Sequence, residues 1–137
     1  MIKIVNLLPE LLGTYGDHGN VATLSWRLSQ RDIAHEVIEA SAFSPLPNDG
    51  DFYLLGGGED DAQIAAVELL LKQDTLNIAV KNGAQIFAVC AGFQLLGESF
   101  PASQGRAIKG LELLPIITES ATTRSVGELL LDSTLGL

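Results

Sequence analysis

The sequence predicts an α/β fold in which a parallel sheet is covered by helices on both faces. Short apolar runs rich in β-branched residues recur along the chain, and segments with helical spacing separate them. These runs are almost entirely apolar, as expected of strands that are buried on both faces of a parallel sheet. The chain has 137 residues, which suits one domain with a substantial core.

The strands and helices can be placed in order along the chain. We expect strands where apolar runs end at glycine or at polar turns, at 2–8, 35–40, 51–55, 84–89, 110–118 and 125–131. We expect helices where apolar residues recur at helical spacing, at 21–32, 62–73, 74–83 and directly after the cysteine at position 90.

Two details of these helices can also be predicted. Asn20 is the expected N-cap of the first helix, because Asn side chains accept hydrogen bonds from free N–H groups there. Ile64, Val67 and Leu71 are the expected buried face of the second helix.

Composition and charge exclude several classes of protein. The formal net charge is −9, and no Lys/Arg cluster is present to neutralise the phosphates of nucleic acid or an anionic membrane surface. One cysteine cannot form an internal disulfide, so a secreted disulfide scaffold is excluded. The N-terminus lacks the features of a signal peptide, and no apolar run reaches the roughly 18 residues that a membrane span needs. We therefore expect a cytoplasmic protein without direct membrane insertion, and we assign no residue to a metal site.

Three features fall at the carboxyl ends of the predicted strands, where α/β proteins bind their ligands. They are the glycine-punctuated loop at 13–20, the glycines Gly56-Gly57-Gly58 and the cysteine Cys90. We expect the functional site at this edge of the sheet.

Cys90 follows a predicted strand and precedes a predicted helix, as the nucleophile of a strand-to-helix elbow does. Such an elbow needs small residues two positions before and after the nucleophile, and here these are Ala88 and Gly92. The positive end of the following helix favours a thiolate, and the N–H of Ala91 can hold a developing oxyanion. The alternative interpretation is a small buried hydrophobic residue, as most free cysteines are.

The three consecutive glycines allow two interpretations. They can form a flexible strand-to-helix turn, or they can supply a second oxyanion donor whose backbone approaches the substrate closely. A phosphate-binding loop is excluded, because no Gly-Lys-Ser/Thr follows them.

The segment Cys90-Ala91-Gly92-Phe93-Gln94 resembles the Cys-x-Gly-x-Gln elbow of the class I (triad-type) glutamine amidotransferases. The stretches "TYGDHGN", "GGGEDDAQ" and "TTRSVGE" resemble the cobyric-acid-synthase branch and, within it, the glutaminase subunits of lipid II isoglutaminyl synthase. The resemblance runs from Met1 to the last residues. It implies a flavodoxin-like sheet, here incomplete at the C-terminus.

The resemblance also implies roles for individual residues. Cys90 would attack the carboxamide of glutamine, while Ala91 and either Gly57 or Gly58 would donate backbone N–H groups to the oxyanion.

Two further residues match the substrate-binding positions of the family. Gln94 would line the glutamine pocket, and Arg124 would grip the substrate, since a guanidinium can bind both oxygens of a carboxylate. A solvated surface arginine is the alternative interpretation of Arg124.

By the same resemblance, the protein is a glutaminase subunit that forms a glutamyl thioester at Cys90 and passes ammonia to a partner. That partner would be an ATP-dependent, Mur-ligase-like synthetase that amidates D-glutamate of the peptidoglycan precursor lipid II. ATP would be used by the partner, so this chain needs no cofactor of its own.

One family residue is missing. The family uses a histidine downstream of the cysteine as the base, but the two histidines here, His18 and His35, both lie upstream. We expect His35 to be structural and do not assign His18 as the base. The expectation is therefore that residues 1–137 form the N-terminal part of one amidotransferase domain, and that this chain alone is inactive.

Three alternatives stay open at this point. The missing histidine favours a non-catalytic interaction or regulatory domain on the same fold. An amidotransferase domain of a cobyric-acid-synthase-type enzyme would share the same motifs. A redox-responsive cysteine protein would have no need of Gln94 and Arg124 together.

Overall fold

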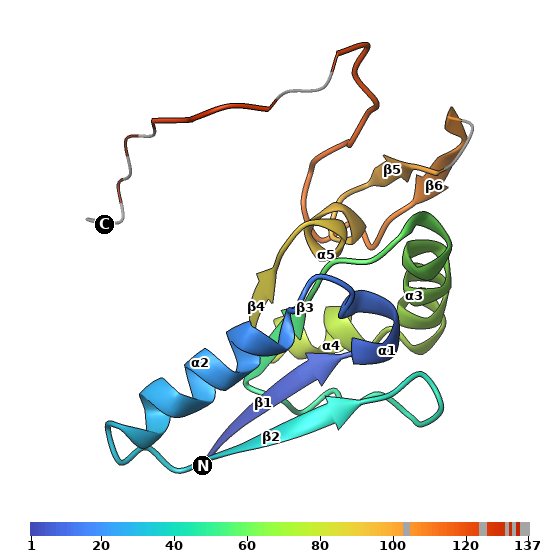
Figure 1. Cartoon of the computed structure of the whole chain (residues 1–137). Coiled ribbons are helices and arrows are strands. Elements are labelled where there is room, and N and C mark those ends of the chain that lie inside the picture. Colours follow the sequence, from blue (N-terminus) through green and yellow to red (C-terminus); the bar gives the residue numbers. More distant parts are fainter. Residues whose placement is uncertain (103–104, 124–125, 131, 133, 135–137) are drawn as a thin grey trace.

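The computed structural model describes residues 1–102, 105–123, 126–130, 132 and 134. Its centre is a four-stranded parallel sheet with the order β2-β1-β3-β4 (Figure 1). The strands are β1 (Ile2–Leu7), β2 (His35–Ala40), β3 (Phe52–Leu55) and β4 (Gln85–Ala88). The first four predicted strands are therefore confirmed, each to within one residue at its ends.

Helices cover both faces of this sheet, because neighbouring residues of a strand point to opposite sides. On one face, Ile4 and Leu54 pack with Val21 of α2 (His18–Ser29). On the other face, Val5 and Leu55 belong to the larger core, which also contains residues of α1 (Pro9–Leu12), α3 (Asp60–Gln73), α4 (Thr75–Lys81) and α5 (Ala91–Leu95). This arrangement confirms the α/β, flavodoxin-like fold class.

The first long helix begins earlier than predicted. Helix α2 starts at His18 with Asp17 as its N-cap, so the prediction of Asn20 as the N-cap was wrong. The turn has already closed before Asn20, because the N–H of Gly19 donates to the carbonyl oxygen of Gly16 at 2.9 Å and that of Asn20 donates to Asp17 at 2.9 Å.

The buried face of α3 also differs from the prediction. Gln63, Ala66, Val67 and Leu70 are buried, whereas Leu71 is 39% exposed. The pattern of apolar residues could not reveal this rotation, because one member of the buried face is polar. Gln63 can be buried because its side-chain amide donates a hydrogen bond to the carbonyl oxygen of Gly58 at 3.0 Å.

The last predicted strands are wrong where the structure describes them. A short antiparallel pair, β5 (Ser99–Pro101) and β6 (Ala107–Lys109), precedes them instead. Within 110–118, only Ile117 forms a β-bridge, to Ser99. The described part of the second segment, 126–130, contains no strand.

The apolar run at 110–118 was predicted as a strand, but its backbone N–H groups form hydrogen bonds with carbonyl oxygens at the end of a helix. The N–H of Leu111 donates to the carbonyl oxygen of Leu95 at 2.8 Å, and that of Leu113 donates to Leu96 at 2.9 Å. These leucines therefore close the end of α5, and they do not extend the sheet.

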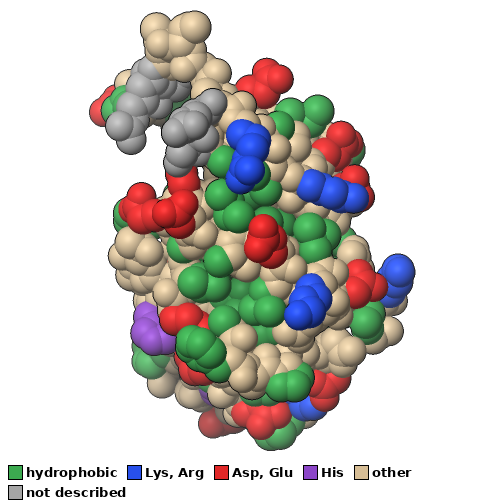
Figure 2. Space-filling view, turned by 90° about the vertical axis from the view of Figure 1, so that its right-hand side faces the viewer, with side chains coloured by type: hydrophobic (Ala, Val, Ile, Leu, Met, Phe, Trp, Pro, Cys, Tyr) green, Lys and Arg blue, Asp and Glu red, His purple; other side chains and the backbone are tan. Residues whose placement is uncertain are grey.

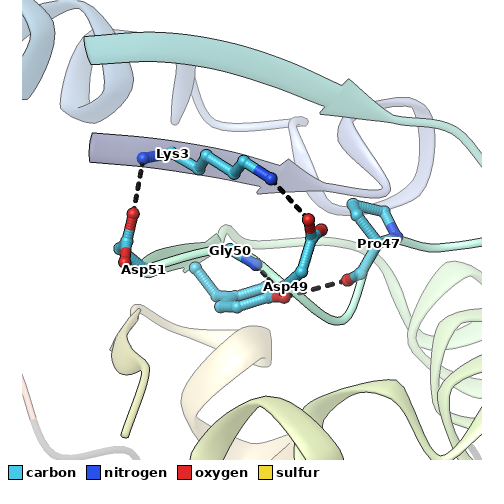
Figure 3. Close-up of polar contacts among 6 residues, drawn as sticks. Lys3, Pro47, Asp49, Gly50 and Asp51 are labelled. Carbon is cyan, nitrogen blue, oxygen red and sulfur yellow. Dashed lines mark hydrogen bonds and ion pairs between the residues drawn. The ribbon is translucent and has the colours of Figure 1, made fainter. Parts of the chain in front are cut away.

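A buried tyrosine anchors the loop that leads into β3. The hydroxyl of the fully buried Tyr53 donates to the carbonyl oxygen of Pro47 at 2.9 Å and accepts from the N–H of Gly50 at 3.0 Å. Across the same loop, the ammonium of Lys3 in β1 pairs with Asp49 (Figure 3). Because that ion pair is exposed, we attribute the stability of the loop mainly to the buried tyrosine.

The charged side chains are spread over the face shown in Figure 2. On the face shown in Figure 2, Lys and Arg side chains stand apart from one another among acidic and apolar ones. In the described residues, none of the helices combines the length and the apolar character that crossing a membrane requires.

We predict that Tyr53→Phe lowers the free energy of unfolding by about 1–2 kcal/mol, because the buried Pro47 carbonyl and Gly50 N–H lose their partner. Urea denaturation of the chain measures this change. Tyr15→Phe is the matched control. Because Tyr15 is exposed, removal of its hydroxyl group should leave the urea midpoint nearly unchanged.

The pH dependence gives a second check on the same variant. Burial raises the pKa of Tyr53 above its ordinary value of 10.0. As the pH rises above this value, Tyr53 ionises in the unfolded protein before it ionises in the folded one, which favours unfolding. Phenylalanine cannot ionise, so only the protein with Tyr53 loses stability in this way. The stability difference should therefore shrink at alkaline pH, and equal midpoints at neutral pH would contradict the prediction.

Candidate active site

Cys90 occupies the tip of a tight turn between β4 and α5. The strand ends at Ala88 and the helix begins at Ala91. The backbone of Cys90 has φ 53° and ψ −119°, and the residue is exposed. A non-glycine residue in a sparsely populated conformation costs about 1–3 kcal/mol and persists only where its surroundings enforce it. The predicted strand-to-helix turn at Cys90 is confirmed, and the interpretation of Cys90 as a buried hydrophobic residue is excluded.

Gly92 holds this turn against the sheet. Its N–H donates to the carbonyl oxygens of Gly56 at 2.9 Å and Val89 at 3.0 Å. A Cβ atom at Gly92 would lie 2.6 Å from the carbonyl oxygen of Leu55, so no side chain fits there. The small residue expected at this position is therefore required by the approach of α5 to the end of β3.

The glycine turn after β3 lies beside the cysteine. Gly56, Gly57 and Gly58 are buried. A Cβ atom at Gly57 would lie 3.3 Å from the Cβ atom of Cys90 and 2.6 Å from the ring of Tyr15. Cys90 and the glycine turn therefore meet at the carboxyl edge of the sheet, as predicted.

A cavity of about 490 Å³ opens at this edge. Cys90, Gln94 and Gly58 line it, which brings three of the predicted site residues together. The other lining residues are mainly polar; they are Tyr15, Glu59, Asp60, Gln63, Pro101, Ala102, Gly105 and Ser120.

The sequence matches a known domain family over nearly its whole length. The model of the CobB/CobQ-like glutamine amidotransferase domain matches residues 3–135. The chain belongs to this family.

Curated relatives support the assignment. The chain is 31% identical over 134 residues to the lipid II isoglutaminyl synthase (glutamine-hydrolyzing) subunit GatD of Staphylococcus aureus, covering 96% of the chain and 55% of the relative. It is 30% identical over 132 residues to GatD of Streptococcus pneumoniae, covering 93% of the chain and 50% of the relative. A hydrogenobyrinate a,c-diamide synthase from Sinorhizobium sp is 33% identical over 92 residues, covering 63% of the chain and 21% of the relative. The chain thus spans about half the length of the two GatD subunits.

In this member of the family, the two candidate glycine donors differ in their hydrogen bonds. The N–H of Gly57 donates to the carboxylate of Asp17 at 2.9 Å. In the described part of the chain, the N–H of Gly58 has no such acceptor, and Gly58 lines the cavity. Ala91 is the first residue of α5, so its N–H has no partner within the helix. These hydrogen bonds favour Gly58 over Gly57 as the partner of Ala91 in the predicted oxyanion site, and both roles stay predictions.

Arg124, which the family resemblance assigns to the substrate, lies outside the described residues, and its role stays a prediction. Gln94 is half-buried in the wall of the cavity, four positions after the cysteine. Its position agrees with the predicted substrate contact, which also stays a prediction.

Sequence reasoning missed a polar pair in the lining of the cavity. The hydroxyl of Tyr15 donates to the carboxylate of Glu59 at 2.5 Å, and this hydrogen bond together with the negative charge of Glu59 raises the pKa of Tyr15. The pair joins the loop after α1 to the N-cap of α3. The signal was present, since "TYGDHGN" and "GGGEDD" both follow strands at the active edge, but nothing in the sequence shows that they touch.

Neither histidine lines the cavity of Cys90. His35 has both ring nitrogens in local contacts, with the hydroxyl of Ser25 at 2.8 Å and the carbonyl oxygen of Ile33 at 3.0 Å, which agrees with a structural role. His18 lies with Nδ1 3.3 Å from the side-chain nitrogen of Asn6. In the described ranges, no group of three or more His, Cys, Asp or Glu side chains is arranged to hold a metal ion.

Strand β4 forms one edge of the described sheet, next to Cys90. The N–H groups of Gln85 and Val89 donate to carbonyl oxygens at the two ends of β3. The backbone groups of Ile86 and Ala88, which alternate with them, therefore point away from β3. Exposed apolar side chains flank this edge and line a second cavity of about 460 Å³; they are Val80, Phe87 and Phe93.

We predict that Cys90→Gly is more stable than Cys90→Ala by about 1 kcal/mol. Glycine relieves the strained conformation, which costs about 1–3 kcal/mol, and this gain exceeds the roughly 0.5–1 kcal/mol by which glycine is ordinarily worse than alanine. Urea denaturation of the two variants measures the difference.

The control is Ala22→Gly on the exposed side of α2, where glycine should instead lower stability. If alanine gives a more stable protein than glycine at both positions, the turn at Cys90 stores no strain.

Proposed function

We propose that this protein is the glutaminase subunit of an enzyme that amidates lipid II. It hydrolyses glutamine at Cys90 and passes ammonia to an ATP-dependent, Mur-ligase-like synthetase, which amidates D-glutamate of this peptidoglycan precursor. One observation carries the proposal: an exposed, strained Cys90 shares a cavity with Gln94 in a chain of which 96% aligns with a lipid II isoglutaminyl synthase subunit.

In the first half of the reaction, the thiol of Cys90 gives its proton to a general base, and its sulfur attacks the carboxamide carbon of glutamine. A C–S bond forms, and the carbonyl oxygen takes the negative charge. The N–H groups of Gly58 and Ala91 stabilise this oxyanion, because they are fixed backbone donors in a partly enclosed site.

In the second half, the C–N bond breaks and ammonia leaves with a proton from a general acid. Water then attacks the glutamyl thioester, the C–S bond breaks, and glutamate and the thiol are released. Gln94 lines the glutamine pocket, and Arg124 binds the substrate carboxylate.

The general acid–base group is proposed to be a histidine from polypeptide beyond these 137 residues. Residues 1–137 would then be the N-terminal part of one amidotransferase domain. Two observations support this view. The two GatD relatives are about twice as long as the aligned region. The outer edge of β4, where the backbone groups of Ile86 and Ala88 have no partner in the described ranges, lies directly before Cys90.

Supply of glutamine and ATP fits a reaction in the cytoplasm, and the glutaminase itself is proposed to need no cofactor. A cobyric-acid-synthase-type amidotransferase is the second candidate, favoured by the similarity to hydrogenobyrinate a,c-diamide synthase. That similarity covers a smaller share of the chain than the similarity to the GatD subunits.

We predict that the 137-residue chain alone releases no ammonia from glutamine, although Cys90 reacts with iodoacetamide. The elbow exposes the sulfur without help from a histidine, whereas proton transfer to the leaving ammonia needs a positioned group worth about 10²–10⁴-fold. The measurement is ammonia release, with Cys90→Ser as the control. Turnover that disappears in the control would place a base within these residues and make His18 the first suspect.

A second prediction concerns Arg124 in the complete enzyme with its synthetase. Arg124→Ala should lower glutamine-dependent amidation roughly 10- to 100-fold, as expected for the loss of a hydrogen-bonded charge pair worth about 1.5–3 kcal/mol. Amidation from added ammonia should be unchanged, because the arginine holds glutamine only.

The matched control for this comparison is Arg31→Ala, an exposed arginine at the far end of α2, which should affect neither nitrogen source. Equal losses with glutamine and ammonia in the Arg124 variant would instead assign Arg124 to folding or to the subunit interface.

A further inference from the structure

We infer that Asp17 and Gln63 are positioning residues that turn the N–H of Gly58 into the cavity of Cys90. The inference rests on the proposed glutaminase function and says which side chains orient its proposed oxyanion donor, Gly58. It also gives a role to the loop 13–17, which the proposed mechanism does not otherwise use.

The glycine turn is held by hydrogen bonds on both sides of Gly58. On one side, the carboxylate of Asp17 accepts from the N–H of Gly57 at 2.9 Å, and the N–H of Thr14 donates to the carbonyl oxygen of Gly57 at 3.2 Å. On the other side, the buried amide of Gln63 donates to the carbonyl oxygen of Gly58 at 3.0 Å.

These bonds fix the direction of the Gly58 N–H. A trans peptide is planar, so its carbonyl and the next N–H point in opposite directions. Because the carbonyl of Gly57 points to the N–H of Thr14, the N–H of Gly58 points away from the backbone of Thr14. Gly58 and Cys90 line the same cavity, and in the described residues this N–H donates to no other group.

Asp17 is suited to this task because its own position is fixed. It is the N-cap of the 12-residue helix α2, and its carboxylate packs so closely on Gly56 that a Cβ there would lie 2.4 Å from Cγ. A charge-assisted hydrogen bond to a backbone N–H is stronger than a neutral one. Asp17 therefore restrains Gly57, and through it the peptide that carries the donor.

The test uses the full-length enzyme with its synthetase and compares two reactions of Cys90. Glutamine hydrolysis develops an oxyanion, whereas alkylation by iodoacetamide displaces iodide from carbon and develops none at the donor site. We expect Asp17→Ala to lower kcat for glutamine roughly 10- to 100-fold, as for a misplaced catalytic group, with little change in KM. The iodoacetamide rate and ammonia-driven amidation should be unchanged.

Further variants make the result decisive. Asp17→Asn, which keeps a neutral acceptor, should give an intermediate loss of kcat, and Gln63→Met should give the same selective loss from the other side of Gly58. Asp32→Asn, beyond the far end of α2, is the matched control for charge and should have no effect.

Unchanged kcat in Asp17→Ala and Gln63→Met would overturn the inference, as would equal losses of kcat and of the iodoacetamide rate. If Asp17→Ala fails to fold, Asp17→Asn and Gln63→Met decide the question by the same criteria. Failure of the proposed function is a separate result, because the unaltered enzyme would then show no glutamine hydrolysis.

Discussion

The geometry of the site depends on one close contact between two backbones. Gly92, in the first turn of α5, approaches the carbonyl of Leu55 at the end of β3 so closely that a Cβ atom would lie 2.6 Å from its oxygen. The N–H of Gly92 is bonded to the carbonyl of Gly56, the first residue of the glycine turn. This contact forces the strained conformation of Cys90 and places it beside Gly57. A larger residue at position 92 would move both halves of the site apart.

Around that contact, the polar groups form two layers with different tasks. The inner layer consists of backbone N–H groups and the sulfur of Cys90, which are proposed to act on glutamine. The outer layer is formed by Asp17 and Gln63, which bond to the glycine turn from the helices α2 and α3. Since both helices are packed on the sheet through apolar residues, the core fixes the outer layer, and the outer layer fixes the donors.

Sequence reasoning located the four strands of the parallel sheet, the fold class and the edge that carries Cys90, because β-branched and apolar runs bounded by turn residues mark such strands. It failed where an apolar run served another purpose. Leu111 and Leu113 bond to the end of α5 and do not form a strand. The rotation of α3 was missed because its buried face includes the polar Gln63. Periodicity carries no information on such contacts, nor on the conformation of the loop that holds Asp17.

Every role proposed for the site depends on a covalent glutamyl thioester at Cys90. Mass spectrometry of the full-length enzyme, after mixing with glutamine and rapid quenching in acid, detects such a thioester directly. We expect a glutamyl adduct that is confined to the peptide containing Cys90 and absent from the Cys90→Ser variant. Glutamine turnover without any adduct at Cys90, or with an adduct on another residue, would contradict this role of Cys90.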